Sequence, residues 1–390
     1  MFAHPKTHVP ECGPPARTPR TAYMSKLSIG IVGLPKVVKS TLFHALTTIA
    51  VPAENYPFCT IDPNVGVVEV PDPRLYGIAA LVKPDRIVPN VVEFVDIAGL
   101  VAGASRGEGL GNKFLQHIRE VDAICHVIRC FEDPAIVGTG VSGDPNADRS
   151  VISLELILAD LEVVERALDR AERRERTGDP ESAVLAGVLR RLASALGDGT
   201  PARRVKMTQD ETRLVKSLNL LTAKPLMYVA NVSEADAGRD SDIARLVREA
   251  VAVEDPDSEV VVLSAQLEAD LLTLEIEERG EYLAAHDISE SGLGELIRAG
   301  YRLLGLTTFF TAGEKEVRAW TVRAGARAPE AAGLIHSDFE RGFIRAETIH
   351  VNEFVGVGSL KAAREAGLMR LEGKEYQVVD GDIMTFRSAT

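Results

Sequence analysis

A short loop near the start of the chain carries the residue types that bind nucleotide phosphates. Gly33 to Thr41 reads Gly-Leu-Pro-Lys-Val-Val-Lys-Ser-Thr, which matches the pattern G-x-x-x-x-G-K-[ST] except at Val38. In such a loop the backbone N–H groups surround the phosphates, Lys39 contacts the terminal phosphates, and the Ser40 hydroxyl binds Mg²⁺. The phosphate-binding residues that this motif predicts are Gly33, Lys36, Val37, Val38, Lys39, Ser40 and Thr41.

Val38 is the departure that decides how well this loop can work. Glycine at this position lets the main chain approach a phosphate without a β-carbon, and a β-branched residue is poorly suited to unusual dihedral angles. If φ is positive there, Val38 stores about 1 to 3 kcal/mol of strain. That energy corresponds to a roughly tenfold to hundredfold change in affinity if all of it falls on the bound state. The alternative interpretation of the segment is an ordinary strand-to-helix turn.

A carboxylate follows a later apolar run. Asp96-Ile97-Ala98-Gly99 comes directly after residues 91–95, a predicted strand, so Asp96 is expected to hold Mg²⁺ through water and the Gly99 N–H to contact a γ-phosphate. Between the two motifs, Thr60 offers a second hydroxyl to Mg²⁺. Glycines at 103, 107, 109 and 111 suggest a segment that becomes ordered when nucleotide binds.

The residues that would read the base follow two further predicted strands. GTPases usually carry Asn-Lys-x-Asp, where the Asp accepts two hydrogen bonds from guanine, and here the segment is Asn231-Val232-Ser233-Glu234. Glu234 is one methylene longer than Asp and Val232 removes the lysine, so ATP is predicted in preference to GTP. Ser264 and Ala265 are expected to complete the base pocket through backbone contacts.

The elements that must position these groups are short apolar strands alternating with helices. Such alternation predicts an α/β fold with a mostly parallel, doubly wound sheet. The strands are predicted at residues 27–32, 65–70, 91–95, 123–128, 227–230 and 260–263, with a helix from about residue 42.

A helical insertion is predicted to interrupt the sheet at residues 138–222. Apolar residues recur at helical spacing on both sides of the break Gly178-Asp179-Pro180, which indicates a hairpin of two antiparallel helices. Its arginines could form a basic arm that reaches RNA, or simply a solvated surface, because acidic residues are interleaved with them. They stand at positions 166, 170, 173, 174, 176, 190, 191, 203 and 204.

The last part of the chain has the pattern of a small mixed α/β domain. Strands are predicted at residues 307–311, 317–322, 346–350 and 376–379, with a helix near 332–341 and a final strand after the turn at 379–383. This pattern fits a barrel-like or ubiquitin-like domain of ~80 residues.

Composition narrows the class further. The chain has 390 residues, 45% of them hydrophobic, and a formal charge of -13. This negative charge opposes nonspecific attraction to nucleic acid, so no DNA specificity is expected and any RNA contact must be a local patch.

The 4 cysteines lack C-x-x-C spacing and fit reduced thiols in a cytoplasm. No apolar run approaches a membrane span, so no membrane partner is expected. Residues 1–23 are expected to be a disordered extension or a start-site artefact, and Met24 directly before the first predicted strand favours the artefact.

Several blocks of sequence together resemble the Obg-like ATPases of the YchF subfamily, and the resemblance spans Met24 to Phe386. The blocks begin at Gly30 (Gly-Ile-Val-Gly-Leu-Pro), Asn55 (Asn-Tyr-Pro-Phe-Cys-Thr-Ile), Phe94 (Phe-Val-Asp-Ile-Ala-Gly-Leu-Val), Gly107 (Gly-Glu-Gly-Leu-Gly-Asn), Phe310 (Phe-Thr-Ala-Gly), Val317 (Val-Arg-Ala-Trp-Thr) and Ile335 (Ile-His-Ser-Asp-Phe-Glu-Arg-Gly-Phe-Ile). The resemblance implies a P-loop NTPase (G) domain at 24–137 and 223–304, the helical insertion at 138–222, and a TGS domain at 305–390.

The resemblance also implies activity and partners. Members hydrolyse ATP slowly, with Mg²⁺, and associate with the ribosome through its large subunit. They lack the catalytic glutamine after D-x-x-G, and Leu100 stands there in this chain. The histidine that matches their candidate for orienting water is His126, so the expected catalytic residues are Lys39, Gly99 and His126. A buried strand histidine is the alternative for His126, and His117 is a weaker rival.

Two departures from the family pattern leave other functions open. The family pattern Asn-Val-Gly-Lys-Ser is Lys36-Val37-Val38-Lys39-Ser40 here, so Lys36 replaces an asparagine that in some related NTPases helps hold a monovalent cation. A degenerate NTPase fold that binds the ribosome or RNA with weakened nucleotide affinity is the second hypothesis. A GTPase is the third, which Glu234 disfavours.

Overall fold

The computed structural model describes residues 27–35, 37–50, 64–97, 109–131, 144–239 and 241–389. The predictions made for residues 1–23, Lys36, Thr60, Gly99 and Leu100 lie outside these ranges. Within them, no helix combines the length and the apolar character that crossing a bilayer requires.

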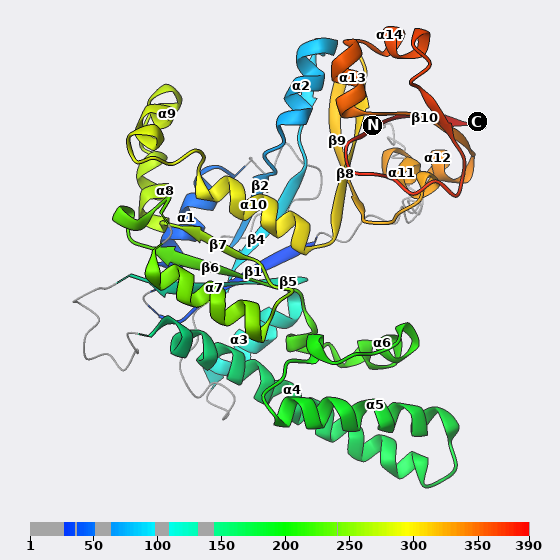
Figure 1. The fold of residues 1–390 in the computed structure, drawn as a ribbon. Helices are drawn as coiled ribbons and strands as arrows, with labels where there is room; N and C mark the ends of the chain where they lie inside the picture. Colours follow the sequence, from blue (N-terminus) through cyan, green and yellow to red (C-terminus); the bar gives the residue numbers. More distant parts are fainter. Residues whose placement is uncertain are drawn as a thin grey trace, which may run out of the picture.

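A six-stranded sheet forms the first half of the fold, and its strands confirm the predicted α/β class (Figure 1). The strand order is β2-β4-β1-β5-β6-β7, and every neighbouring pair is parallel except β2 and β4. Five of the six strands therefore end at one edge, where the motif residues follow them. The strands are β1 (Ser28–Val32), β2 (Val65–Glu69), β4 (Val91–Asp96), β5 (Ala123–Cys130), β6 (Leu226–Val232) and β7 (Val260–Leu263).

Helices cover both faces of this sheet because its central strands are apolar on both sides. The β5 burial pattern is buried at every position, as expected for a strand packed between two helical layers. One face packs against α1 (Lys39–Thr48) and α10 (Gly292–Leu303), with α8 (Ala265–Leu271) beside α1. The other packs against α3 (Gly109–Glu120), α4 (Pro145–Glu175) and α7 (Asp242–Glu254). Helix α9 (Ile276–Ala285) lies at the periphery beyond α8 (Figure 1).

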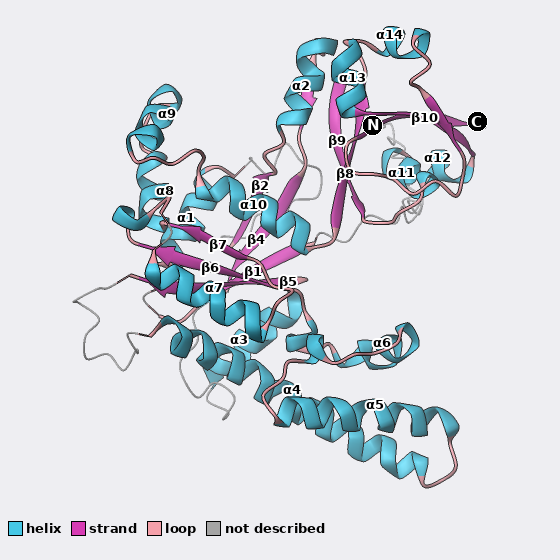
Figure 2. Cartoon of the chain, viewed as in Figure 1, coloured by secondary structure: helices cyan, strands magenta, loops and turns pink. Residues whose placement is uncertain are grey.

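The predicted helical hairpin is present and extends away from the sheet (Figure 2). Helix α4 packs along α5 (Pro180–Gly197) through an apolar core of their own. Gly178, with φ of 85°, makes the turn, and Asp179 then caps α5 by accepting a hydrogen bond from the Glu181 N–H. Both helices begin with proline after an aspartate cap, a strong start signal. Helix α6 (Gln209–Val215) and short 3-10 turns, η4 (Ala202–Arg204) among them, return the chain to β6.

A second six-stranded sheet, of mixed direction, forms the C-terminal part, in the order β11-β10-β12-β8-β9-β3. Its strands are β8 (Leu306–Ala312), β9 (Glu316–Arg323), β10 (Phe343–His350), β11 (Arg370–Glu372), β12 (Asp382–Ser388) and β3 (Arg86–Val88). Its helices are α11 (Ala328–Ile335), α12 (Ser337–Arg341), α13 (Val351–Val357) and α14 (Leu360–Glu365). The TGS assignment and the domain boundaries stay predictions.

Two C-terminal elements differ from the prediction. Residues 376–379 are not a strand: Gln377 makes only an isolated bridge to Arg327, and the Val379 N–H donates to the Asp382 carboxylate at 3.0 Å, which holds a turn instead. The helix predicted near residues 332–341 is two helices, because His336 is extended and caps α12 by accepting from the Asp338 N–H.

A segment from the first part of the sequence adds a strand to the C-terminal sheet. The sequence pattern did not predict this pairing. Strand β3 pairs in parallel with β9, and α2 (Pro73–Val82) packs its Leu75 and Ile78 against Phe310 and Phe354. Asn90 also donates to the hydroxyls of Tyr301 and Thr308. The two sheets are therefore joined by a buried interface as well as by the chain after α10.

Candidate nucleotide site

The phosphate loop lies between the end of β1 and the start of α1, as the motif requires. Gly33 is needed at the first position for a steric reason: a β-carbon there would lie 2.7 Å from Cγ2 of Val37 and 3.0 Å from the carbonyl oxygen of Val127. Helix α1 has no side-chain cap and no acidic residue in its first turn. Its first N–H groups are thus left for another acceptor, which is the arrangement that favours an anion.

Val38 adopts the left-handed conformation, with φ of 64° and ψ of 25°. Because φ is positive, Val38 carries the strain that the sequence analysis made conditional on this angle. The pattern has glycine at this position because glycine adopts the left-handed conformation without that strain. The half-buried Val38 side chain packs against the apolar core that α1 shares with the sheet. Its carbonyl accepts the hydrogen bond of the Leu42 N–H at 3.1 Å, so the strained residue still begins a regular helix.

Lys39 and Asp96 are brought together from two separate motifs. The Lys39 ammonium forms an ion pair with the Asp96 carboxylate at the end of β4, and the two side chains are only 9% and 20% exposed. Ser40, in the first turn of α1, is exposed, and Thr41 is half-buried. The sequence predicted both charged residues at this edge but not their direct contact.

Asn231 connects the phosphate loop to the segment expected to read the base. Its side-chain amide donates to the Val37 carbonyl at 3.1 Å, and its oxygen accepts from the Ala265 N–H at 2.9 Å. Because Asn231 is only 2% exposed, these hydrogen bonds are shielded from water and fix both loops relative to β6. Ser264 caps α8 by accepting from the Leu267 N–H.

The other two residues predicted to read the base differ in their exposure to solvent. Val232 is buried, whereas Glu234 is exposed at the start of the 3-10 turn η7 (Glu234–Asp236). The Glu234 carboxylate is thus open to a ligand, and no core packing depends on it.

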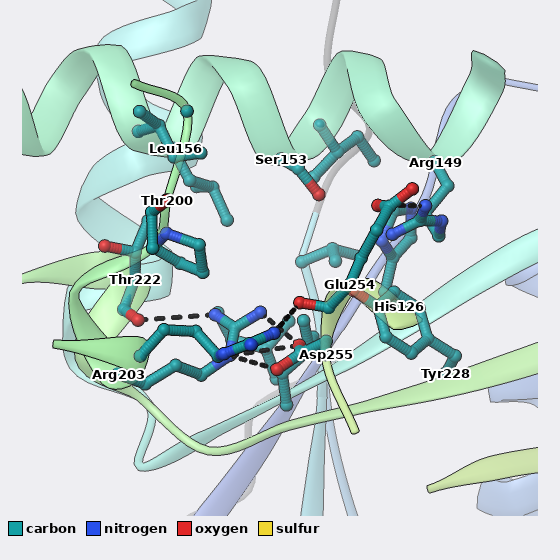
Figure 3. Close-up of a pocket in the computed structure, with 18 of the residues that line it drawn as sticks. His126, Arg149, Ser153, Leu156, Thr200, Arg203, Thr222, Tyr228, Glu254 and Asp255 are labelled. Atoms are coloured by element: carbon teal, nitrogen blue, oxygen red, sulfur yellow. Dashed lines mark hydrogen bonds and ion pairs between the residues drawn. The ribbon is translucent and has the colours of Figure 1, made fainter. Parts of the chain in front are cut away.

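The backbone of His126 pairs with Val32, directly before the phosphate loop, but its side chain is on the opposite sheet face from α1. Its buried side chain packs against Tyr228, with ring centroids 5.6 Å apart, on the sheet face covered by α4 (Figure 3). Burial, followed by the positive charge of Arg149, lowers the pKa of His126 to about 3. The pocket that His126 lines contains none of residues 33–41, so the structure does not bring this histidine together with Lys39 and Asp96 there. A role in orienting water stays a prediction from the resemblance.

Sequence reasoning missed the polar groups around His126. Arg149 was not considered, although its spacing from Ile152 and Leu156 places it on the apolar face of α4. A charged residue at a core position of a helix was the signal that could have found it.

The class of protein follows from this geometry. A mostly parallel sheet carries a phosphate loop after its β1 strand, an aspartate at the end of β4, and an asparagine near the end of β6 that hydrogen-bonds to the loop. Together these features define a P-loop nucleotide-binding domain of the GTPase type.

Comparisons with known proteins agree with this class and make it specific. Residues 28–158 match the family described as 50S ribosome-binding GTPase, and residues 306–389 match a YchF-GTPase C-terminal family described as a protein of unknown function (DUF933). A Bacillus subtilis protein named "Ribosome-binding ATPase YchF" is 53% identical over 364 residues, which cover 93% of this chain and 99% of the relative. A Haemophilus influenzae protein of the same name is 52% identical over 358 residues, covering 92% and 98%.

A solved structure gives the same result. The Schizosaccharomyces pombe YchF GTPase aligns with a TM-score of 0.83 and 36% identity, over 93% of this chain and 98% of that one. The chain belongs to the YchF family. The names of these relatives disagree on the base, since two are called ATPases and one a GTPase.

Proposed function

We propose that this chain is a ribosome-binding ATPase whose nucleotide state controls its binding to the large subunit, in a cytoplasmic setting. The observation that carries the nucleotide part is the ion pair of Lys39 with Asp96 beside the uncapped start of α1. The ribosome part is supported by relatives above 50% identity that are named ribosome-binding ATPases.

The donor set fits Mg²⁺. The Ser40 hydroxyl and the Asp96 carboxylate are hard oxygen donors, and Mg²⁺ usually takes one or two protein oxygens and completes its shell with phosphate and water. Among the residues that the structure describes, no group of three or more His, Cys, Asp or Glu side chains could hold an ion alone. Mg²⁺, when bound with ATP, would neutralise charge on the β- and γ-phosphate oxygens.

The chain's own groups would then bind and orient the triphosphate. The ammonium of Lys39, partnered by Asp96, would turn toward the terminal phosphates, and the first N–H groups of α1 would donate to phosphate oxygens. In-line attack by water places negative charge on the γ-phosphate oxygens, which Lys39 and the Gly99 N–H would stabilise. The same proposal makes Thr60 the source of a second hydroxyl for Mg²⁺ and includes Lys36 among the phosphate-binding residues.

For the base we propose adenine. Glu234 is exposed and longer than the aspartate that usually accepts two hydrogen bonds from guanine, and Val232 is buried without a charge. The exposed carboxylate can therefore be changed without disturbing the core.

Calorimetric titration with ATP, GTP and ADP in Mg²⁺ buffer tests the proposal. We expect ATP to bind more tightly than GTP, Lys39→Ala to remove binding, and Lys361→Ala, at a side chain 88% exposed in the C-terminal part, to leave it unchanged. Co-sedimentation with large ribosomal subunits should differ between ATP and ADP. Undetectable binding at millimolar ATP with Mg²⁺ would rule out the ATPase.

A second candidate function rests on a specific observation. The left-handed Val38 strains the loop, so a protein that binds the ribosome with little nucleotide affinity is the alternative. Wild-type ribosome binding that does not respond to nucleotide would favour it.

A further inference from the structure

A pocket that does not include the Lys39–Asp96 pair lies where the helical hairpin meets the sheet. It has a volume of about 390 Å³, within the size of small-molecule sites. Its walls come from α4, η4, the end of α7 and the sheet face at β5 and β6 (Figure 3). Neither Lys39 nor Asp96 lines it, so it does not belong to the nucleotide site.

The strongest sign of a ligand is a hydrogen-bond donor without an acceptor. Arg149 is 3% exposed, and its guanidinium lies 5.7 Å from the centre of the Tyr228 ring. One terminal nitrogen donates to Glu254 at 2.5 Å, but Nε has no partner among the described residues. A buried donor left unpaired is costly, so an acceptor is missing from this wall of the pocket.

The charges that line the pocket favour a negatively charged acceptor. Three arginines face two carboxylates: Arg149 pairs with Glu254, Arg203 pairs with Asp255, and Arg204 donates to the backbone carbonyl of Glu254. His126, whose pKa burial keeps low, adds no charge. The Glu254 side chain is 58% exposed, so solvent screens its charge and the buried Arg149 is only partly neutralised.

Apolar side chains form much of the remaining lining. Ile152 and Leu156 lie on the same face of α4 as Arg149, Ile124 and Leu226 lie on the sheet, and all four are nearly fully buried. Such a lining binds a hydrocarbon or aromatic surface and offers nothing to a bare inorganic ion.

We propose that this pocket binds a small organic anion that has an apolar body and one carboxylate, sulfonate or phosphate group. The anionic group accepts from Nε of Arg149, and the body lies against Ile152 and Leu156. Because the pocket is walled by both the hairpin and the sheet, the ligand also fixes the hairpin to the nucleotide domain.

The test uses the full chain and the dye 8-anilinonaphthalene-1-sulfonate, which has an aromatic body and one sulfonate. Fluorescence titration is expected to show one site. Arg149→Gln should weaken binding at least about tenfold, since a hydrogen bond to a charged group is lost. Ser153→Trp, which projects into the pocket from α4, should abolish it, and the matched control Leu154→Trp, at an exposed position of the same helix, should not.

Competition with ATP or inorganic phosphate shows which site the dye occupies. Neither ATP with Mg²⁺ nor inorganic phosphate should displace the dye at concentrations that leave the chain folded by near-ultraviolet circular dichroism. Displacement by ATP would place the dye in the nucleotide site, and displacement by phosphate alone would show that the apolar body is not recognised. Either result, or binding unchanged by Ser153→Trp, would overturn the proposal and leave a water-filled cavity.

Discussion

The left-handed Val38 gives the sharpest test of the phosphate loop. Replacing Val38 with Gly removes about 1 to 2 kcal/mol of left-handed strain. Against this, Gly adds about 0.5 to 1 kcal/mol of backbone entropy to the unfolded chain, and the contacts of a half-buried valine are worth about 1 kcal/mol. The two sides nearly cancel, so the free energy of unfolding of Val38→Gly should lie within about 1 kcal/mol of wild type.

A second variant, Val38→Ala, separates the cost of the left-handed backbone conformation from the loss of side-chain contacts. Alanine loses the same contacts as glycine but keeps the left-handed penalty, so Val38→Gly should be more stable than Val38→Ala by about 1 kcal/mol in urea unfolding. The Val38 side chain packs toward the core, so calorimetry should find the ATP affinity of Val38→Gly within about threefold of wild type.

Two results would refute this reasoning. Equal stability of the alanine and glycine variants would mean that the loop is not left-handed at this position. A gain of more than about tenfold in ATP affinity for Val38→Gly would mean that the valine obstructs the phosphates, and the degenerate-NTPase alternative would then be favoured.

Three further predictions follow from single side chains. Asn231→Ala should lower the free energy of unfolding by about 2 to 4 kcal/mol and weaken ATP binding, because the Val37 carbonyl and the Ala265 N–H lose buried partners. Glu234→Asp should leave stability unchanged and raise the ratio of GTP to ATP affinity in calorimetric competition, because the shorter carboxylate suits guanine. His126, with its pKa lowered from 6.5 to about 3 by burial and then by Arg149, stays neutral in the fold, so the unfolded chain binds the extra proton between these values. Stability should therefore fall as pH drops below 6.5, by up to about 1.4 kcal/mol per pH unit, and His126→Gln should remove that component.

Each of these has an outcome that contradicts it. Unchanged unfolding of Asn231→Ala would mean that its two hydrogen bonds are replaced by water, and an unaltered base preference of Glu234→Asp would remove that residue from base recognition. For His126→Gln, urea unfolding at pH 7 and pH 5 decides the stability claim. ATP turnover of the same variant tests the separate prediction that His126 orients water: a loss of about a hundredfold or more would support that role, and a rate within about threefold of wild type would count against it.

The sequence predicted an element correctly where residues close together along the chain determine its structure. The strands around the phosphate loop and the hairpin break at Gly178 were predicted correctly because apolar periodicity and turn residues act over a few positions. The helix near residues 332–341 was predicted as one because the capping role of His336 depends on its conformation, which periodicity does not reveal.

By itself, the sequence determined the class of the fold, the edge at which the site lies, and the identity of most of its polar groups. Only the tertiary structure decided that Lys39 meets Asp96, that Asn231 ties two loops together, and that His126 lies beneath α4 with Arg149. It also decided that β3 completes a sheet formed by residues more than two hundred positions later. The physical reason is that these contacts join segments distant in sequence, and their geometry depends on how helices pack on the sheet rather than on any local pattern.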